Sequence, residues 1–209
     1  QINDQPANYT IDSIGDWSSH LQTLLSNGAY QLAYPWYKPD CSDMSRLSEE
    51  PTWRCENLVF SNKPLHEIVV STYGAADDVE NISSVSDVKG LTICRPDGYF
   101  THDLEAMELV EPTVTRIAPP TPEDCFEALA ANETDLVSLN ADTSDRIIRE
   151  MQMGERIAEV INLSTVQTLH VVGMRSDPRT RILMRRVDKG LKAIEDQGLI
   201  REIAPTHLN

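Results

Sequence analysis

The sequence lacks the features by which several classes of protein are recognised. No apolar run approaches the roughly 20 residues that a membrane-spanning helix needs. The formal net charge is −15 and the sequence pI is about 4.6, which argues against nucleic acid as a partner, because phosphate binding needs a clustered basic surface. The one basic cluster, at residues 175–192, has apolar residues at helical spacing and is expected to be a solvated helix face. No GxGxxG, GxxxxGKS/T or GxSxG motif occurs in the 209 residues. We therefore expect no nucleotide cofactor, and no cofactor of any other kind.

Histidine and cysteine are sparse, and their spacing does not indicate a metal site. The five histidines form no HExxH motif or paired spacing, so we expect each to be a surface or core residue rather than a ligand. They are His20, His66, His102, His170 and His207. The four cysteines contain no CxxC pair, which makes a zinc site unexpected.

The four cysteines permit three disulfide pairings. A Cys41–Cys55 bond would close a polar loop, and a Cys94–Cys125 bond would tie the end of a strand to the start of a helix. Two disulfides would indicate an oxidising compartment such as the periplasm, whereas four free thiols would indicate a cytosolic protein. The connectivity itself stays open at this point.

The chain begins at Gln1 rather than Met and shows no charged-then-apolar leader. We expect either a mature protein whose signal peptide has been removed or an excised segment.

The hydrophobic pattern alternates between strand and helix periods, which predicts an α/β architecture with a parallel sheet. Strands are expected at 8–14, 30–33, 65–72, 91–93, 113–117, 136–139, 160–163 and 169–174. Helices are expected after Asp16, at 101–107, from Pro122 with Thr121 as N-cap, at 143–153, from Pro178 and after Gly198. Irregular structure is expected in the cysteine-bracketed loop 39–55 and in the acidic linker 74–84.

The stretch 91–105 has the pattern of a strand, a glycine turn and a helix start. Pro96, Asp97 and Gly98 interrupt the strand, and Thr101 can cap the helix that follows. Such a turn directs unpaired N–H groups at a small polar or anionic group. An ordinary strand–helix turn is the alternative interpretation.

Three aromatic residues, Tyr34, Trp36 and Tyr37, flank Pro35 at an expected strand end, although only 6% of the chain is aromatic. They either pack locally under the following loop or form one wall of a binding cleft.

Four blocks occur in order along nearly the whole chain. They are DWSSHL at 16–21, FSNKPL at 60–65, VSDVKGLTI at 85–93, and VVGM at 171–174 followed by Asp177-Pro178 and a long helical pattern. In this order and spacing the chain resembles the type II periplasmic solute-binding proteins, the family 3 amino-acid-type binders of ABC transporters.

The resemblance implies two α/β lobes that are joined by two crossing strands and close over a ligand by a hinge motion. Mapped onto this chain, lobe one is residues 1–72 and 172–209, and lobe two is residues 73–171. The strand and helix that usually open the family fold are missing before residue 8. The implied protein is a periplasmic monomer, not an enzyme, which captures a small polar solute (an amino acid, an amine or a related compound) and delivers it to a membrane permease.

The resemblance also implies where the ligand lies. The turn at 98–101 corresponds to a hydroxyl-bearing segment that holds a carboxylate in the family, and Thr101 keeps such a hydroxyl. Asn140 stands where amino-acid binders have an aspartate that pairs with an ammonium group, with Asp142 two residues on. A family arginine that grips a carboxylate is missing at 37–40. The expected ligand-binding residues are Tyr34, Trp36, Tyr37, Gly98, Tyr99, Phe100, Thr101, Asn140 and Asp142.

These departures leave the charge of the ligand open. The aromatic rings can enclose a cation, with charge supplied by Asp40, Asp97 or Asp142, whereas Lys38 and Thr101 can bind an anion. Two other functions use the same fold. One is an enzyme, a dehydratase or lytic transglycosylase, with Glu67 or Glu105 as the acid/base. The other is a sensor domain cut from a larger receptor.

Overall fold

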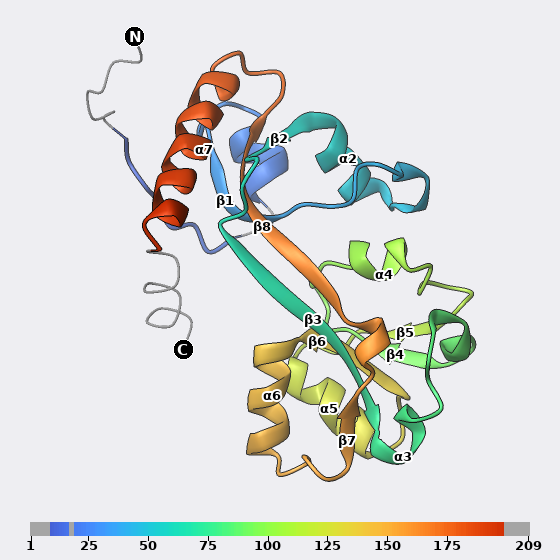
Figure 1. The fold of residues 1–209 in the computed structure, drawn as a ribbon. Helices are drawn as coiled ribbons and strands as arrows, with labels where there is room; N and C mark the ends of the chain where they lie inside the picture. Colours follow the sequence, from blue (N-terminus) through green and yellow to red (C-terminus); the bar gives the residue numbers. More distant parts are fainter. Residues whose placement is uncertain (1–8, 17–18, 199–209) are drawn as a thin grey trace.

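The computed structural model describes residues 9–16 and 19–198. The chain forms two lobes that are joined by two long strands, β3 (His66–Ala75) and β8 (Thr165–Met174) (Figure 1). The two strands pair antiparallel at 66–70 and 165–169. Beyond this junction β3 continues into lobe two and β8 into lobe one. The predicted pair of crossing strands is thus confirmed, while the predicted lobe bounds at 72/73 and 171/172 stay a prediction.

Each lobe combines helices with its own end of one continuous sheet. Lobe one contains η1 (His20–Leu25), β1 (Ala33–Tyr37), η2 (Met44–Arg46), α2 (Glu49–Asn57), β2 (Leu58–Phe60) and α7 (Thr180–Asp196). Lobe two contains α3 (Ala76–Val79), η3 (Val85–Val88), β4 (Thr92–Cys94), α4 (His102–Ala106), β5 (Thr115–Ile117), α5 (Pro122–Ala130), β6 (Leu136–Asn140), α6 (Ala141–Glu150), β7 (Ile157–Glu159) and η4 (Ile161–Leu163).

The sheet is mixed, so the expectation of a parallel sheet is wrong. Its strand order is β1-β8-β3-β6-β4-β5, with β2 also on β8 and β7 also on β3. Within the described residues β4 pairs in parallel with β5 and β6, whereas β3 and β8 pair antiparallel with all their neighbours. Strands that are connected through helices in lobe two pair in parallel, as is typical of βα units, whereas the strands that cross between the lobes pair antiparallel.

Several local predictions need correction. Residues 9–14 form no strand, because they have no sheet partner. The strand expected at 30–33 instead runs from Ala33 through the aromatic residues to Tyr37, where β8 supplies its partners. The loop expected at 39–55 contains η2 and α2, and the expected linker contains the end of β3 and α3. The strand expected at 160–163 is replaced by β7 and η4, and the helix expected after Gly198 lies outside the described residues.

Local capping and cysteine chemistry agree better with expectation. The Thr121 side chain accepts a hydrogen bond from the Asp124 amide, and Pro122 opens α5 as predicted. The disulfides Cys41–Cys55 and Cys94–Cys125 are both formed. The first connects the loop after β1 to α2, and the second connects β4 to α5.

Each lobe has its own hydrophobic core. In lobe two the period of the strands places Cys94 and Val137 on one face of the sheet, and Ile93 and Leu136 on the other, and both faces are covered. The described core of lobe one is smaller and is centred on Leu21, Leu25, Leu58 and Val172. The Cys41–Cys55 disulfide therefore constrains the lobe that has less apolar surface to bury.

The packing of β8 against α7 depends on Gly173. A Cβ atom at this position would lie 2.8 Å from the Cγ2 atom of buried Thr180 and 3.1 Å from the carbonyl oxygen of Gln31. We expect Gly173→Ala to lower the free energy of unfolding by about 1–3 kcal/mol through overpacking. Gly190 is an exposed position of α7, and nothing lies within 4 Å of a Cβ atom added there. Gly190→Ala is therefore expected to raise the free energy of unfolding by roughly 0.5–1 kcal/mol. Urea denaturation measures both, and equal effects of the two variants would contradict this packing.

Candidate functional site

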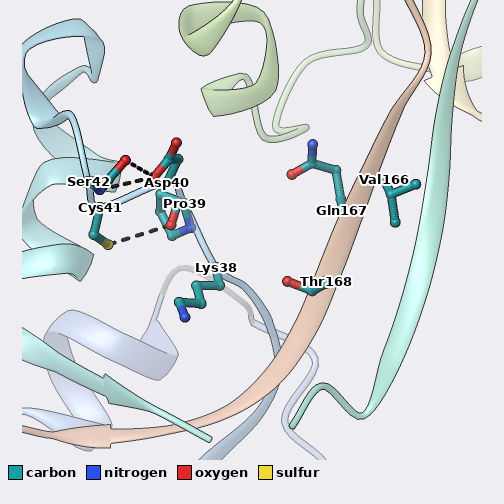
Figure 2. Close-up of a pocket in the computed structure, with 8 residues that line it drawn as sticks. All are labelled: Lys38, Pro39, Asp40, Cys41, Ser42, Val166, Gln167 and Thr168. Atoms are coloured by element: carbon teal, nitrogen blue, oxygen red, sulfur yellow. Dashed lines mark hydrogen bonds between the residues drawn. The ribbon is translucent and has the colours of Figure 1, made fainter. Parts of the chain in front are cut away.

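A crevice of about 490 Å³ lies where lobe one meets the junction of the crossing strands (Figure 2). Residues 38–42, which follow β1, line one side, and residues 166–168 of β8 line the other. The volume is in the range of small-molecule sites. The crevice thus places a polar loop of lobe one opposite a crossing strand, beside the paired segments of β3 and β8 that join the lobes.

The loop beside the crevice carries one cation and one anion, Lys38 and Asp40. The Oδ1 atom of Asp40 accepts hydrogen bonds from the Ser42 amide at 3.0 Å and from the Ser42 hydroxyl at 2.6 Å (Figure 2). The hydroxyl, and then the amide, lower the pKa of Asp40, so the carboxylate stays ionised at neutral pH. The loop therefore carries charges of both signs, an anion that Ser42 holds in place and a cation two residues before it, which suits a zwitterion or an ammonium compound.

The predicted aromatic wall and the predicted glycine turn meet. The rings of Tyr37 in lobe one and Phe100 in lobe two have their centroids 3.9 Å apart. His102 continues the cluster, with its ring centroid 4.8 Å from that of Phe100. Burial raises the pKa of the Tyr37 hydroxyl, so Tyr37 is neutral and able to donate a hydrogen bond. Among the predicted site residues, Tyr37 and Phe100 are thus brought together across the two lobes.

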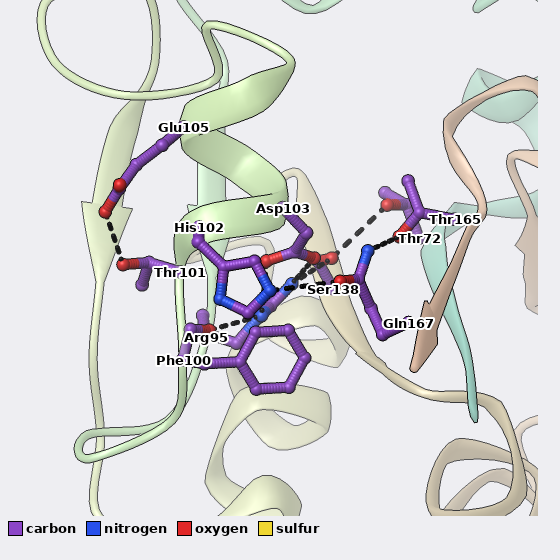
Figure 3. Close-up of polar contacts among 10 residues, drawn as sticks. All are labelled: Thr72, Arg95, Phe100, Thr101, His102, Asp103, Glu105, Ser138, Thr165 and Gln167. Atoms are coloured by element: carbon purple, nitrogen blue, oxygen red, sulfur yellow. Dashed lines mark hydrogen bonds and ion pairs between the residues drawn. The ribbon is translucent and has the colours of Figure 1, made fainter. Parts of the chain in front are cut away.

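A buried cation fixes the turn that carries Phe100. The Arg95 and Asp103 side chains form a bidentate pair, with Nη1–Oδ1 at 3.1 Å and Nη2–Oδ2 at 2.8 Å (Figure 3). Arg95 also donates to the Phe100 carbonyl at 2.6 Å and to the Ser138 hydroxyl at 2.8 Å. Arg95 is 1% exposed and Asp103 is 3% exposed. The four bonds hold the guanidinium beneath the Phe100 ring, whose centroid lies 5.2 Å from Cζ.

Hydrogen bonds of Ser138 in this network and of the neighbouring residue His102 reach the two crossing strands. The Ser138 hydroxyl accepts a hydrogen bond from the Thr72 hydroxyl of β3 at 3.4 Å. The His102 Nε2 atom lies 3.0 Å from the Gln167 Oε1 atom of β8, while the Gln167 amide donates to Thr165 (Figure 3). Gln167 also lines the crevice, so this one residue contacts both the crevice and His102 of α4 in lobe two.

Other predicted residues are engaged elsewhere. The Thr101 hydroxyl donates to Glu105, and the Asn140 side chain caps α6 by accepting from the Thr143 amide. Asp142 is exposed in the first turn of α6. Trp36 lies against Arg54, whose Cζ atom is 5.0 Å from the ring centroid.

The remaining predicted residues stand at the surface. Tyr34 is 49% exposed and Tyr99 is 41% exposed. Gly98 adopts a φ of +75°, a left-handed conformation that explains glycine at this turn. Their role in binding stays a prediction.

The two predicted acid/base candidates differ in their surroundings. Both carboxylate oxygens of Glu105 accept hydrogen bonds from Ser48 or Thr101, while Glu67 is exposed on β3. Neither residue lines the crevice. Within the described residues no group of three His, Cys, Asp or Glu side chains is arranged to hold a metal ion. None of the described helices has the length and apolar character of a membrane span.

Sequence reasoning missed Arg95, Asp103, Gln167 and Thr168 as members of the site. Arg95 and Asp103 stand on either side of the turn at residues 96–101, so their charges were a visible signal for an ion pair. Gln167 and Thr168 gave no such signal, because they precede the segment expected to be a strand.

Comparison with solved structures identifies the fold. The chain is similar to a histidine kinase sensor domain with similarity to periplasmic binding proteins, at a TM-score of 0.62 and 19% identity over 92% of this chain and 75% of that one. It is similar to the GluR0 ligand-binding core in complex with L-glutamate, at a TM-score of 0.61 and 11% identity over 89% of this chain and 76% of that one. It is also similar to the Streptococcus pneumoniae substrate-binding protein AbpA of an amino acid ABC transporter, bound to L-arginine. Here the TM-score is 0.57, with 15% identity over 86% of this chain and 68% of that one.

These similarities show that the chain has the two-lobed type II periplasmic-binding-protein fold, as the sequence blocks predicted. No family model matches the sequence, and no curated protein matches it.

The Arg95–Asp103 pair gives a stability prediction. We expect Asp103→Asn to lower the free energy of unfolding by about 3–5 kcal/mol, because it leaves the buried Arg95 cation without its counter-charge. Glu150→Gln, which removes the exposed pair with Arg146, is expected to cost less than about 0.5 kcal/mol. Urea denaturation measures both, and a small loss in Asp103→Asn would show that the pair is not the anchor of the turn.

His102 gives a pH prediction. Burial lowers its pKa, and Arg54 adds to this, while Asp103, Gln167 and Glu105 oppose it. The unfolded chain therefore binds the proton more readily, so stability falls as pH drops below about 6.5.

His170 shifts in the same direction through burial, so His102→Gln is expected to remove only part of the loss of stability between about pH 7 and pH 5. Thermal unfolding of the wild type and of His102→Gln across this pH window measures the loss of stability. An unchanged pH profile would exclude His102 as a contributor.

Proposed function

We propose that this protein captures a small polar solute, an amino acid, an amine or a related compound, in the crevice between its lobes. The crevice carries the proposal, because it places Lys38 and Asp40 opposite a polar strand at the junction on which the two lobes are joined. Burial of a polar solute needs such convergent charged and hydrogen-bonding groups to replace its water. The lobe bounds of 1–72 with 172–209, and 73–171, are part of this proposal.

Transport is the first candidate for the role that solute capture serves. In it the protein is a monomer in the periplasm that delivers solute to an ABC transporter permease. The similarity to AbpA supports this role, and the two disulfides support an oxidising compartment.

A sensor role is the second candidate. The similarity to a histidine kinase sensor domain, which extends over 92% of this chain, favours it. Both roles use the same capture step and differ in the partner that recognises the closed lobes. A permease that is stimulated by the purified protein would support the first, and a kinase whose activity depends on the solute would support the second.

The solute is best identified from the protein itself. Native mass spectrometry of protein purified under mild conditions is expected to show an added mass of a small polar compound. Isothermal titration with that compound then gives its affinity for the protein after unfolding, dialysis and refolding.

Asp40 is the residue through which this proposal is tested. We expect Asp40→Asn to weaken binding of the identified solute about tenfold, roughly the 1.5 kcal/mol of one charge-assisted hydrogen bond. Asp43→Asn is a matched control: Asp43 accepts the same pair of bonds, from the Ser45 amide and hydroxyl, yet does not line the crevice. Equal affinities of the two variants would remove Asp40 from the site.

A further inference from the structure

The two lobes also touch away from the crevice, where α4 of lobe two meets the start of α2 in lobe one. Glu105 of α4 is the centre of this contact, and it is only 7% exposed. Its Oε2 atom accepts a hydrogen bond from the Ser48 amide at 2.8 Å, and its Oε1 atom accepts one from the Ser48 hydroxyl at 2.9 Å. A carboxylate of one lobe is thereby held by two donors of the other.

A third donor comes from within lobe two. The Thr101 hydroxyl donates to the Oε1 atom of Glu105 at 2.9 Å (Figure 3). This bond fixes the side chain in the orientation that faces Ser48. The carboxylate therefore does not need to reorganise when the lobes meet, which favours the contact.

Ser48 is suited to this role by its place in the fold. It is the N-cap of α2, a position at which the backbone amide has no partner inside the helix. Its own side chain makes no capping bond to the helix, so both donors are available to Glu105. A negative charge at a helix N-terminus is also favoured by the helix dipole.

The contacts around this pair are weaker. Arg46 lies 3.4 Å from Glu108 and donates to the Ala106 carbonyl at 3.4 Å, but Arg46 and Glu108 are both exposed. Exposed pairs of this kind contribute little and are screened by salt. Glu105 is thus the buried member of the contact and the one expected to govern it.

We propose that Glu105 and Ser48 form a latch that holds the two lobes together. The latch is separate from the crevice, because neither Ser48, Thr101 nor Glu105 lines it. Solute and latch therefore stabilise the same closed arrangement without competing for the same groups. Where the proposed solute binding holds, loss of the latch lowers the apparent affinity in proportion to the closed fraction.

The Ser48 amide reports the latch directly. Its bond to Glu105 joins the two lobes, whereas the Thr52 amide bonds to the Ser48 carbonyl inside lobe one. Hydrogen exchange of ¹⁵N-labelled protein, stripped of solute by unfolding, dialysis and refolding, is compared for the wild type, Glu105→Gln and Glu108→Gln. The radius of gyration of each is measured by small-angle X-ray scattering.

We expect the Ser48 amide to exchange at least about tenfold faster in Glu105→Gln, with the Thr52 amide unchanged and a larger radius of gyration. Glu108→Gln is expected to match the wild type. Equal Ser48 exchange in all three proteins would overturn the latch.

If Glu105→Gln does not fold, Ser48→Pro decides, because proline lacks both the amide and the hydroxyl donor and fits the Ser48 φ of −68° at the N-cap of α2. A larger radius of gyration in Ser48→Pro supports the latch, and an unchanged radius contradicts it. The test uses no solute, so its failure leaves the proposed solute binding untouched, and a failure to bind solute leaves the latch result standing.

Discussion

Arg95 donates two hydrogen bonds to Asp103 inside lobe two, where both side chains are buried. Charges taken out of water are tolerated only when they are paired and their remaining hydrogen-bonding groups are satisfied. Here the Phe100 carbonyl and the Ser138 hydroxyl accept two further bonds from the guanidinium, while its Nε atom is buried without a hydrogen-bond partner. The pair spans the turn between β4 and α4, so it fixes the backbone that carries Phe100, Thr101 and Glu105 toward lobe one. The inter-lobe contacts depend on that position.

Crevice, aromatic contact and latch form one arrangement around the junction of β3 and β8. Gln167 lines the crevice and hydrogen-bonds to His102, so the crossing strand is connected to α4, the helix that bears Glu105. The Cys41–Cys55 disulfide ties the charged loop of the crevice to α2, whose first residue comes directly after Ser48. In the proposed function, solute contacts in the crevice and latch contacts on α2 therefore stabilise the same contact between the lobes. Such a device serves delivery to a permease or signalling by a receptor equally well.

The sequence was informative where structure is local, and less so where it depends on distant partners. The N-cap of α5 at Thr121 agrees with turn chemistry, and the two disulfides are one of the pairings that the sequence left open. The bounds of β1 differ from those expected, because β8, far along the chain, supplies its hydrogen-bonding partners. In the site, the aromatic segment and the glycine turn were both expected to contribute ligand-binding residues, and Tyr37 and Phe100 of these two segments are in contact. The use of Asn140 as a helix cap, and of Arg95 as an internal anchor, was missed because each depends on neighbours that only the fold supplies.

We propose that a small polar solute lies between the loop after β1 and the crossing strand β8. The most direct test of this proposal is a titration of ¹⁵N-labelled protein with the solute that mass spectrometry identifies, monitored by amide chemical-shift changes. The account predicts that the largest changes fall on residues 38–42 and 166–168, with smaller ones at the contact between the lobes. Changes confined to the outer faces of either lobe, with these residues unmoved, would contradict it.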